Sequence, residues 1–344
     1  MLDSSTADHT SDRQAVGKLG ARLVGLRERA ASIWSGSRIG HWCGKHQVGE
    51  RFHAWWEGYE FVPRAAEPAA ETPKSRAEPT LQPTTSGWPA PRLEVVQTLF
   101  GEGMIAPAEA GTLVKMIKPL GLNEKMTVIE LGSGLGGLAR VVATETGAYV
   151  TGFEPDAILA KMGMDISTKH GLSRKAAIKQ AEVTVIDVRP KSVDAILAKE
   201  AMFTVVDKPT LFGAIRKALK PGGQLMLSDF MLAGEAPGAA VEAWGAKEPQ
   251  PPHMLSVPAM RTALEELGLQ VSITEDVTAE YRSAAISAFA NLAERMTSGE
   301  IGERMCPWAI CEGELWSRRL AVLASGEVKL IRLYARLPAV KELT

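Results

Sequence analysis

The sequence is poor in cysteine, balanced in charge and without an apolar run long enough to cross a membrane. Cys43, Cys306 and Cys311 make no even disulfide framework and no C-x-x-C pattern, so we expect reduced thiols and no metal site. Lysine and arginine number 39 against 40 acids, and this balance does not favour nucleic acid as a partner. A membrane span needs roughly 20 apolar residues, which no stretch supplies.

The first residues, "MLDSSTADHTSDRQ", are polar and acidic where a signal peptide begins basic and continues apolar. We therefore expect a cytoplasmic protein. Its 344 residues, of which 45% are hydrophobic, suffice for one large or two modest globular domains.

Composition divides the chain into three parts. Residues 1–62 are expected to form a helical arm, because apolar residues recur at helical spacing and basic residues occupy the other face. Residues 63–91 are rich in Pro, Ala, Glu and Thr, which predicts a linker. Residues 92–344 are expected to form the main domain.

The arm also holds four of the eight tryptophans. A basic amphipathic helix with aromatic residues is suited to the surface of an anionic membrane. Docking on the main domain or self-association with a second copy explains the same pattern, so both interpretations stay open.

From residue 92 onward, short apolar runs alternate with helical patterns. Such alternation is typical of parallel βαβ units, so we predict an α/β fold, a doubly wound Rossmann-like sheet of seven strands, mostly parallel with the last strand antiparallel. The expected strands are 126–131, 148–154, 176–182, 193–201, 223–230, 269–278 and 327–337, and the expected helices are 135–147, 156–171, 208–219 and 256–268.

The stretch "VIELGSGLGG" joins the first expected strand to the first of these helices and satisfies two patterns at once. Gly132-x-Gly134-x-x-Gly137 is the dinucleotide fingerprint, whereas Glu130-x-Gly132-x-Gly134-x-Gly136 fits the same letters and implies a different enzyme. In either case glycines let backbone N–H groups approach a ligand, and the next helix points its positive end at it. The glycines alone therefore do not identify the ligand.

Carboxylates beside the turn discriminate better between the two patterns. Glu130 lies two residues before the first glycine, where a pyrophosphate would be repelled but the ammonium group of a methionine tail would be bound. Capping of the helix is a simpler role for the same side chain. Glu154 ends the second expected strand, where an acid binds ribose hydroxyls in either type of site.

More polar residues follow the later strands. Glu182 comes after the third strand, Lys199 and Glu200 after the fourth, and Asp229 near the end of the fifth. Because ligands of open α/β sheets gather at the carboxyl ends of the strands, we expect these side chains to lie together. Each acid by itself is explained as a solvated loop residue, so the hypothesis depends on their common position.

Together these pieces resemble the class I S-adenosylmethionine (SAM)-dependent methyltransferases. The resemblance lies in "VIELGSGLGG", "TGFEPD", "AEV" and "ALKPGGQLMLSDF", in this order. Within that group, "LFGEGM", "VVDKPTLFGAIRKALKPGG" and "LWSRRLAVLASGEVKLIRLYARL" are similar to segments of the phosphoethanolamine- and sarcosine-type small-molecule N-methyltransferases. The similarity covers about residues 92–340.

The resemblance implies SAM as the cofactor and assigns most of a site. Glu130 and the glycines would hold the methionine end, Glu154 the ribose and Glu182 the adenine amine. Lys199 or Glu200 would lie beside the sulfonium. The implied cofactor-binding residues are Glu130, Gly132, Ser133, Gly134, Gly136, Glu154, Pro155, Glu182, Val183 and Lys199.

The sequence departs from the phosphoethanolamine enzymes at four positions. Thr204 replaces a histidine, Val96 and Phe230 replace tyrosines, and Ala106 replaces a serine that binds the cofactor carboxylate. The hydroxyl and imidazole groups that hold a phosphorylated amine are therefore missing. We expect a more apolar or differently shaped acceptor.

Methyl transfer needs mainly orientation and desolvation, and a tuned base only where the acceptor is oxygen or carbon. No acid–base pair stands out in the sequence. The catalytic candidates are Glu200, Thr204 and Asp229, and the further acceptor-side candidates are Glu102, Trp244 and His253. For His253, which follows Pro252, an exposed loop position is the simpler explanation.

The sequence thus predicts a SAM-dependent methyltransferase that acts on a small metabolite or lipid-like molecule, preferably on nitrogen. O- or C-methylation of an apolar substrate is the main alternative. An NAD-dependent oxidoreductase is disfavoured by "LKPGG" downstream of the turn, and a non-catalytic SAM-binding protein by the intact glycines. A structural or interaction protein would leave the acids unexplained.

Overall fold

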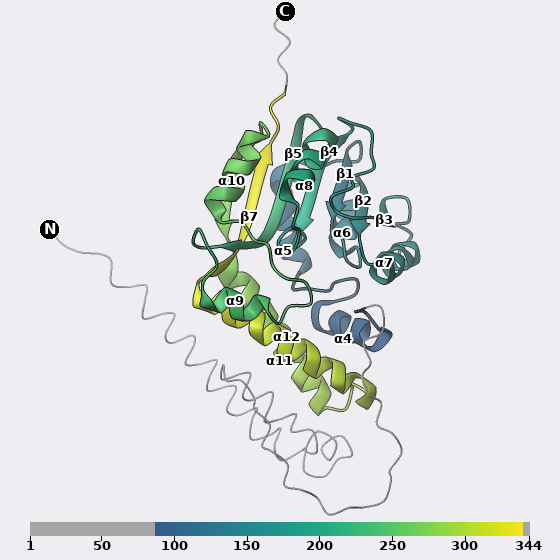
Figure 1. Ribbon diagram of the computed structural model, residues 1–344. Coiled ribbons are helices and arrows are strands. Elements are labelled where there is room, and N and C mark those ends of the chain that lie inside the picture. Colours follow the sequence, from purple (N-terminus) through teal and green to yellow (C-terminus); the bar gives the residue numbers. More distant parts are fainter. Residues whose placement is uncertain (1–86, 340–344) are drawn as a thin grey trace, which may run out of the picture.

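The computed structural model describes residues 87–339 (Figure 1). The arm, residues 1–62, and most of the expected linker, residues 63–91, lie outside this range. The membrane or subunit contact of the arm and the cytoplasmic location therefore stay predictions. Helix α4, Ala90–Phe100, begins within the last residues of the expected linker.

Seven strands form one sheet in the order β3-β2-β1-β4-β5-β7-β6. The neighbours among β1 to β5 pair in parallel, whereas β7 pairs antiparallel with both β5 and β6. This arrangement confirms the predicted fold class, including the antiparallel last strand. The strands are β1 Thr127–Leu131, β2 Tyr149–Glu154, β3 Ala176–Gln180, β4 Val193–Lys199, β5 Leu219–Leu232, β6 Gln270–Asp276 and β7 Val328–Arg336.

Helices cover both faces of the sheet (Figure 1). Val128 and Val150 pack toward α5, α6 and α7, whereas Ile129 and Ile196 pack toward α8 and α10. Neighbouring residues of β1 are therefore buried on opposite faces, which explains why the parallel strands are continuous apolar runs. The helices are α5 Ala110–Ile117, α6 Gly137–Thr146, α7 Ala157–Lys169, α8 Lys208–Ala218 and α10 Val257–Glu266, with a 3₁₀ turn η1 at Lys118–Leu120.

Strand β5 is longer than the sequence predicted. It begins at Leu219, which pairs with Val193 of β4 before a register shift in the ladder. The "LKPGG" segment still ends helix α8, because α8 stops at Ala218 and Leu219 is already extended. The segment is therefore both the end of a helix and the beginning of a strand.

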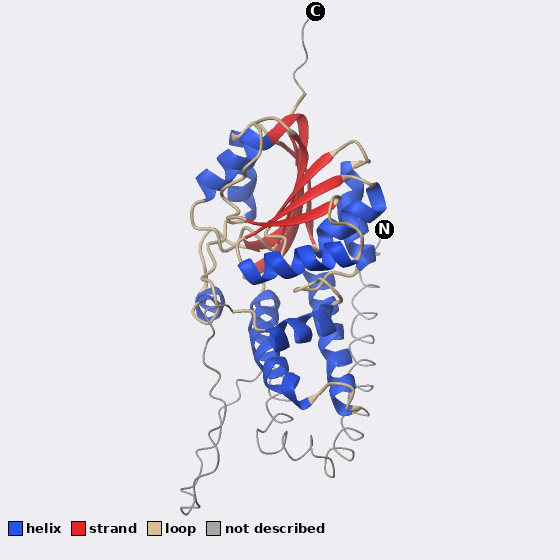
Figure 2. Cartoon of the chain, turned by 90° about the vertical axis from the view of Figure 1, so that its right-hand side faces the viewer, coloured by secondary structure: helices blue, strands red, loops and turns tan. Residues whose placement is uncertain are grey.

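Helices also form a second layer next to the sheet (Figure 2). Phe100, Phe289 and Trp316 from three of these helices form an aromatic core, with the Phe100 and Trp316 ring centroids 5.1 Å apart. Phe230 and Leu232, near the carboxyl end of β5, pack in the same cluster. The helices are α4, α9 Ala239–Gly245, α11 Thr278–Thr297 and α12 Cys306–Ser325, with a 3₁₀ turn η2 at Glu303–Met305.

The apolar patterns of the sequence did not predict α4, α5, α9, α11 or α12. Helix α11 contacts α4, α12 and β7, so its apolar residues face several neighbours and do not form one stripe of helical period. Among the described residues, no helix combines the length and the apolar character that crossing a membrane requires.

Candidate active site

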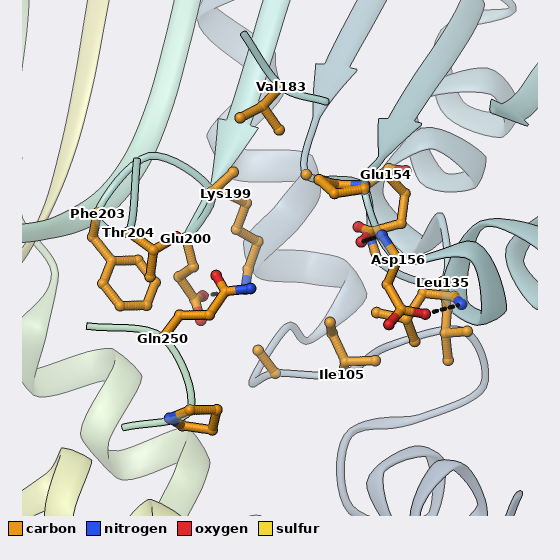
Figure 3. A pocket seen from close by; sticks show the side chains of 18 of the residues that line it. Ile105, Leu135, Glu154, Asp156, Val183, Lys199, Glu200, Phe203, Thr204 and Gln250 are labelled. Carbon is orange, nitrogen blue, oxygen red and sulfur yellow. Dashed lines mark hydrogen bonds and ion pairs between the residues drawn. The ribbon is translucent and has the colours of Figure 1, made fainter. Parts of the chain in front are cut away.

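A cavity of about 730 Å³ lies where the carboxyl ends of β1, β2 and β4 meet the helical layer. Glu154 and Asp156 lie at one end, the glycine-turn end, whereas Lys199, Glu200 and Thr204 lie at the other, the aromatic end (Figure 3). The sequence-predicted residues that line the cavity are Glu130, Gly132, Ser133, Gly134, Glu154, Pro155, Glu182, Val183, Lys199, Glu200 and Thr204.

The glycine turn has a backbone that other residues would strain. Gly132, Gly134 and Gly136 have φ angles of 62°, 54° and 76°, in the left-handed region. A Cβ atom on Gly132 would also lie 2.5 Å from the Cβ of Ala201, and one on Gly134 would lie 2.9 Å from Cδ1 of Ile105. The turn leads directly into α6, whose first residue lines the cavity, so the positive end of a helix faces a bound ligand.

Glu130 is a buried acid with an unsatisfied oxygen. Its side chain is 3% exposed, and Oε2 has no hydrogen-bond partner among the described residues. Burial raises the pKa of Glu130 to about 8, although a backbone bond from Ala139 and the charges of Arg140 and Lys199 lower it. The Oγ of Ser133 is likewise buried without a partner. Two unpartnered acceptors beside a glycine turn fit a ligand that brings its own donors, such as an ammonium group.

Glu154 stabilises the same turn from the end of β2. One carboxylate oxygen accepts from the backbone N–H of Gly134 at 2.7 Å, and the other accepts from that of Asp156 at 2.9 Å. Burial raises the pKa of Glu154, and these two bonds oppose the rise. Each oxygen keeps a second lone pair, so the carboxylate can still accept from ligand hydroxyls.

The aromatic end combines a carboxylate with ring faces. Glu200 follows β4 with a φ of 53°, which is rare for a residue with a side chain. Its carboxylate is paired with Lys199 and accepts from the hydroxyl of Tyr281 at 2.5 Å. Phe203 and Phe230 line the cavity here, with ring centroids 5.1 Å apart. Such an end can receive a cationic or an apolar group.

Two of the predicted site residues do not line the cavity. Asp229 is 1% exposed, and its carboxylate accepts from the backbone N–H groups of Met202 at 2.7 Å and Phe230 at 2.8 Å. The side chain therefore holds the segment after β4 and does not reach a ligand. Gly136 lies on the far side of the turn, where a Cβ would be 2.6 Å from Ile178.

Replacing Asp229 by alanine should lower the free energy of unfolding by about 1 to 3 kcal/mol, because two backbone donors lose their buried acceptor. Burial raises the pKa of Asp229 to about 7. The folded state therefore binds its proton more tightly than the unfolded chain, and wild-type stability should fall as the pH rises from about 4 to about 7. Chemical denaturation across this range checks both effects, and the same pH dependence in the alanine variant would contradict the assignment.

The three further acceptor-side candidates also lie outside the lining. Glu102 is exposed and paired with side chains at the end of α7. Trp244 is buried behind Phe203, with ring centroids 6.2 Å apart. His253 is exposed, as its simpler explanation required, although its backbone N–H donates to the carbonyl of Phe203. Of the positions that depart from the phosphoethanolamine enzymes, only Val96 is away from the cavity, buried in α4.

Several residues that line the cavity or lie directly behind it were not anticipated from the sequence. Arg140, behind the turn, donates to the carbonyl oxygens of Leu135 at 2.8 Å and Gly103 at 3.4 Å and so joins the turn to the segment that follows α4. A Cβ on Gly103 would overlap the Arg140 guanidinium at 1.7 Å, so glycine is required there. The helical layer and its loops add Trp88, Arg92, Glu248, Glu312, Trp316 and Arg319 to the lining.

Comparison with known proteins identifies the domain. Residues 107–272 match the family model described as a methyltransferase domain. Phosphoethanolamine N-methyltransferase 1 of Arabidopsis thaliana is 24% identical over 185 residues, which are 54% of this chain and 37% of that protein. A sterol 24-C-methyltransferase of Gibberella zeae is 31% identical over 119 residues, which are 34% of this chain and 30% of that protein. The chain thus spans about a third of the length of these curated relatives.

Solved structures share the fold at low identity. A phosphoethanolamine N-methyltransferase 2 of Haemonchus contortus, in complex with phosphomonomethylethanolamine and S-adenosylhomocysteine, superposes with a TM-score of 0.62 at 15% identity, covering 72% of this chain and 57% of that chain. A geranyl diphosphate C-methyltransferase of Streptomyces coelicolor superposes with a TM-score of 0.52 at 17% identity, covering 67% and 77%. Residues 107–272 therefore match a methyltransferase domain, as the sequence predicted, and the solved structures share its fold.

Proposed function

We propose that this chain transfers a methyl group from SAM to a small molecule and that the acceptor atom is an amine nitrogen. The observation that carries the donor half is Glu130, a buried carboxylate with an unpartnered oxygen beside three left-handed glycines. An ammonium group would satisfy that oxygen, whereas a pyrophosphate would be repelled by it. This favours a methionine tail over a dinucleotide.

The remaining donor contacts follow from the lining of the glycine-turn end. Glu154 is placed to accept from ribose hydroxyls, and Glu182 and Val183 from the third βα loop would border the adenine. The backbone N–H groups around Gly132 and Gly134 would approach the methionine end closely. SAM, when bound, supplies a methyl group already activated on a sulfonium.

The proposed binding of the methyl acceptor is based on the residues at the aromatic end of the cavity. In the transfer, the nitrogen lone pair forms a bond to the methyl carbon, the carbon–sulfur bond breaks, and its electron pair stays on sulfur. The nitrogen must be neutral when it attacks, so an acceptor that is an ammonium in solution must first release its proton to water. Glu200 would hold this amine by a charge-assisted hydrogen bond, and Phe203 and Phe230 would exclude water around it.

C-methylation of an apolar molecule is the second candidate. The aromatic lining favours it, and the relatives include a sterol 24-C-methyltransferase. In that case Phe203 and Phe230 would contact a hydrocarbon, and Glu200 would take a proton from carbon. The two candidates differ in the acceptor atom and share the donor site.

The proposal is tested by incubating the protein with methyl-labelled SAM and a mixed extract of metabolites and lipids. We expect the label in molecules that a cation exchanger retains at acidic pH and that chromatography separates from unreacted SAM, which is also a cation, because methylated amines are cations there. Label confined to neutral lipids would contradict N-methylation and support the second candidate. Binding of S-adenosylhomocysteine without any transfer of label would indicate a SAM-binding protein without catalysis.

A further inference from the structure

We infer that the methyl acceptor carries its amine on an uncharged, largely apolar body, and that the aromatic end of the cavity excludes phosphorylated amines. The inference rests on the proposed function, because it specifies the molecule that would occupy this end. It is carried by the basic side chains that line the cavity and by the partners that they already have.

Arg92 is the first of these basic side chains. Its Nε donates to Oε1 of Glu312 at 2.5 Å, and the two side chains are only 15% and 3% exposed. Its Nη1 donates to the carbonyl oxygen of Gly87 at 2.6 Å, and the guanidinium carbon lies 4.1 Å from the ring centroid of Trp88. The Arg92 guanidinium therefore already has hydrogen-bond partners at its edge and an aromatic ring against its face before any acceptor binds.

Arg319 is the second, and its pairing is more complete. Its Nε and Nη2 donate to the two carboxylate oxygens of Glu248, at 2.9 and 2.8 Å. Glu248 is 2% exposed and also accepts from Nε1 of Trp244 at 2.6 Å. A bidentate pair of this kind uses the edge of the guanidinium that a phosphate would need. The bond to Glu248 raises the pKa of Arg319 despite its burial.

Lys199 is the third, and it is paired with Glu200. Each of the three basic side chains among the described residues of the lining thus has a carboxylate partner. To bind a phosphate, an arginine would have to leave its glutamate and strand a buried carboxylate without a partner, which is costly. Further acids in the lining disfavour an anionic ligand, namely Glu154, Asp156, Glu182 and Asp207.

Aromatic groups supply the remaining surface at this end. Phe203 and Phe230 pack edge to face, and Phe230 makes a second edge-to-face contact with Tyr281 at 5.9 Å. Trp316, which is fully buried, lines the same end. Such faces favour an apolar body, and they attract an ammonium as well. The amine would lie against Glu200 and its body against the rings.

The exclusion of anionic amines is tested on the wild-type protein with two pairs of amines. The members of each pair differ by one anionic group: ethanolamine with phosphoethanolamine, and 2-phenylethylamine with phenylalanine. Initial rates with labelled SAM give kcat/KM for each. We expect the member without the anionic group to be at least about tenfold better in each pair, because the site has no unpaired cation to offset like-charge repulsion. We also expect 2-phenylethylamine to exceed ethanolamine.

A variant tests whether the ion pairs of the lining arginines cause this selectivity against phosphorylated amines. Glu248→Gln keeps an oxygen for the Trp244 N–H but releases Arg319 from its ion pair, so phosphoethanolamine should improve relative to ethanolamine by about tenfold. Glu265→Gln is the matched control, since it removes the partner of Arg261 on the exposed face of α10. If the Glu248 variant does not fold, Glu312→Gln releases Arg92 in the same way.

The outcomes separate this inference from the proposed function. Phosphoethanolamine equal to or better than ethanolamine in the wild type would overturn the inference and leave N-methylation standing. No methylation of any of the four amines, with S-adenosylhomocysteine bound, would overturn both the inference and the choice of nitrogen. Failure to bind S-adenosylhomocysteine would overturn the proposed function itself.

Discussion

Replacing Glu130 by glutamine is expected to weaken the binding of S-adenosylhomocysteine by about 2 kcal/mol, or about 30-fold. Glutamine keeps the size of the side chain but cannot form a charge-assisted bond with the ligand's ammonium group. The unpartnered Oε2 is a buried acceptor in the glycine-turn end that a donor from the ligand would satisfy. Isothermal titration of both proteins measures the difference.

The same substitution should abolish a pH dependence. Glu130 has a pKa of about 8 and faces Arg140, Lys199 and Glu154, and only its ionised form pairs with an ammonium. As the pH rises from 6 to 8 the ionised fraction grows, so wild-type affinity should increase by up to about tenfold per pH unit. The glutamine variant should show no such increase. The exposed Glu145 on α6, the helix that follows the glycine turn, gives the control, Glu145→Gln, and equal affinities for all three proteins would contradict the assignment.

Replacing Glu200 by glutamine is expected to lower kcat/KM for an amine acceptor by about 100-fold, because the amine loses both its charge-assisted hydrogen bond and its orientation. Affinity for S-adenosylhomocysteine should change far less than in the Glu130 variant, since Glu200 belongs to the aromatic end. Initial rates with labelled SAM, together with titration of the product, separate the two effects.

Tyr281→Phe is the matched control for that experiment. It removes the hydroxyl that donates to Glu200 at 2.5 Å and leaves the carboxylate in place. Its effect should therefore be about tenfold or less, the size expected for one hydrogen bond. Full turnover in the Glu200→Gln variant would show that Glu200 has no part in holding the acceptor.

The elements that the sequence could predict are those whose information is local. A glycine turn and an acid at a strand end are each recognised from a few neighbouring letters, and the Glu130, Gly132 and Glu154 found in this way all line the cavity. The walls of the aromatic end are different. Arg92 pairs with a glutamate 220 residues away, and Arg319 with one 71 residues away. No periodicity or short motif encodes such pairs.

The glycine turn also shows how little a short motif reveals about the ligand. Gly136, part of the methyl-donor pattern, faces away from the cavity and is required by its φ of 76° and by Ile178 behind it. Gly137, part of the dinucleotide pattern, lines the cavity and leaves room for Met104. Both fingerprints are thus satisfied by packing alone, and the discriminating feature is the unpartnered carboxylate of Glu130.

The central claim is that this cavity holds a methyl donor and not a dinucleotide. Calorimetric titration of the intact chain with S-adenosylhomocysteine and, separately, with NADH tests it most directly. We expect one molecule of S-adenosylhomocysteine to bind per chain and NADH not to bind. Tight binding of NADH without binding of S-adenosylhomocysteine would contradict the account.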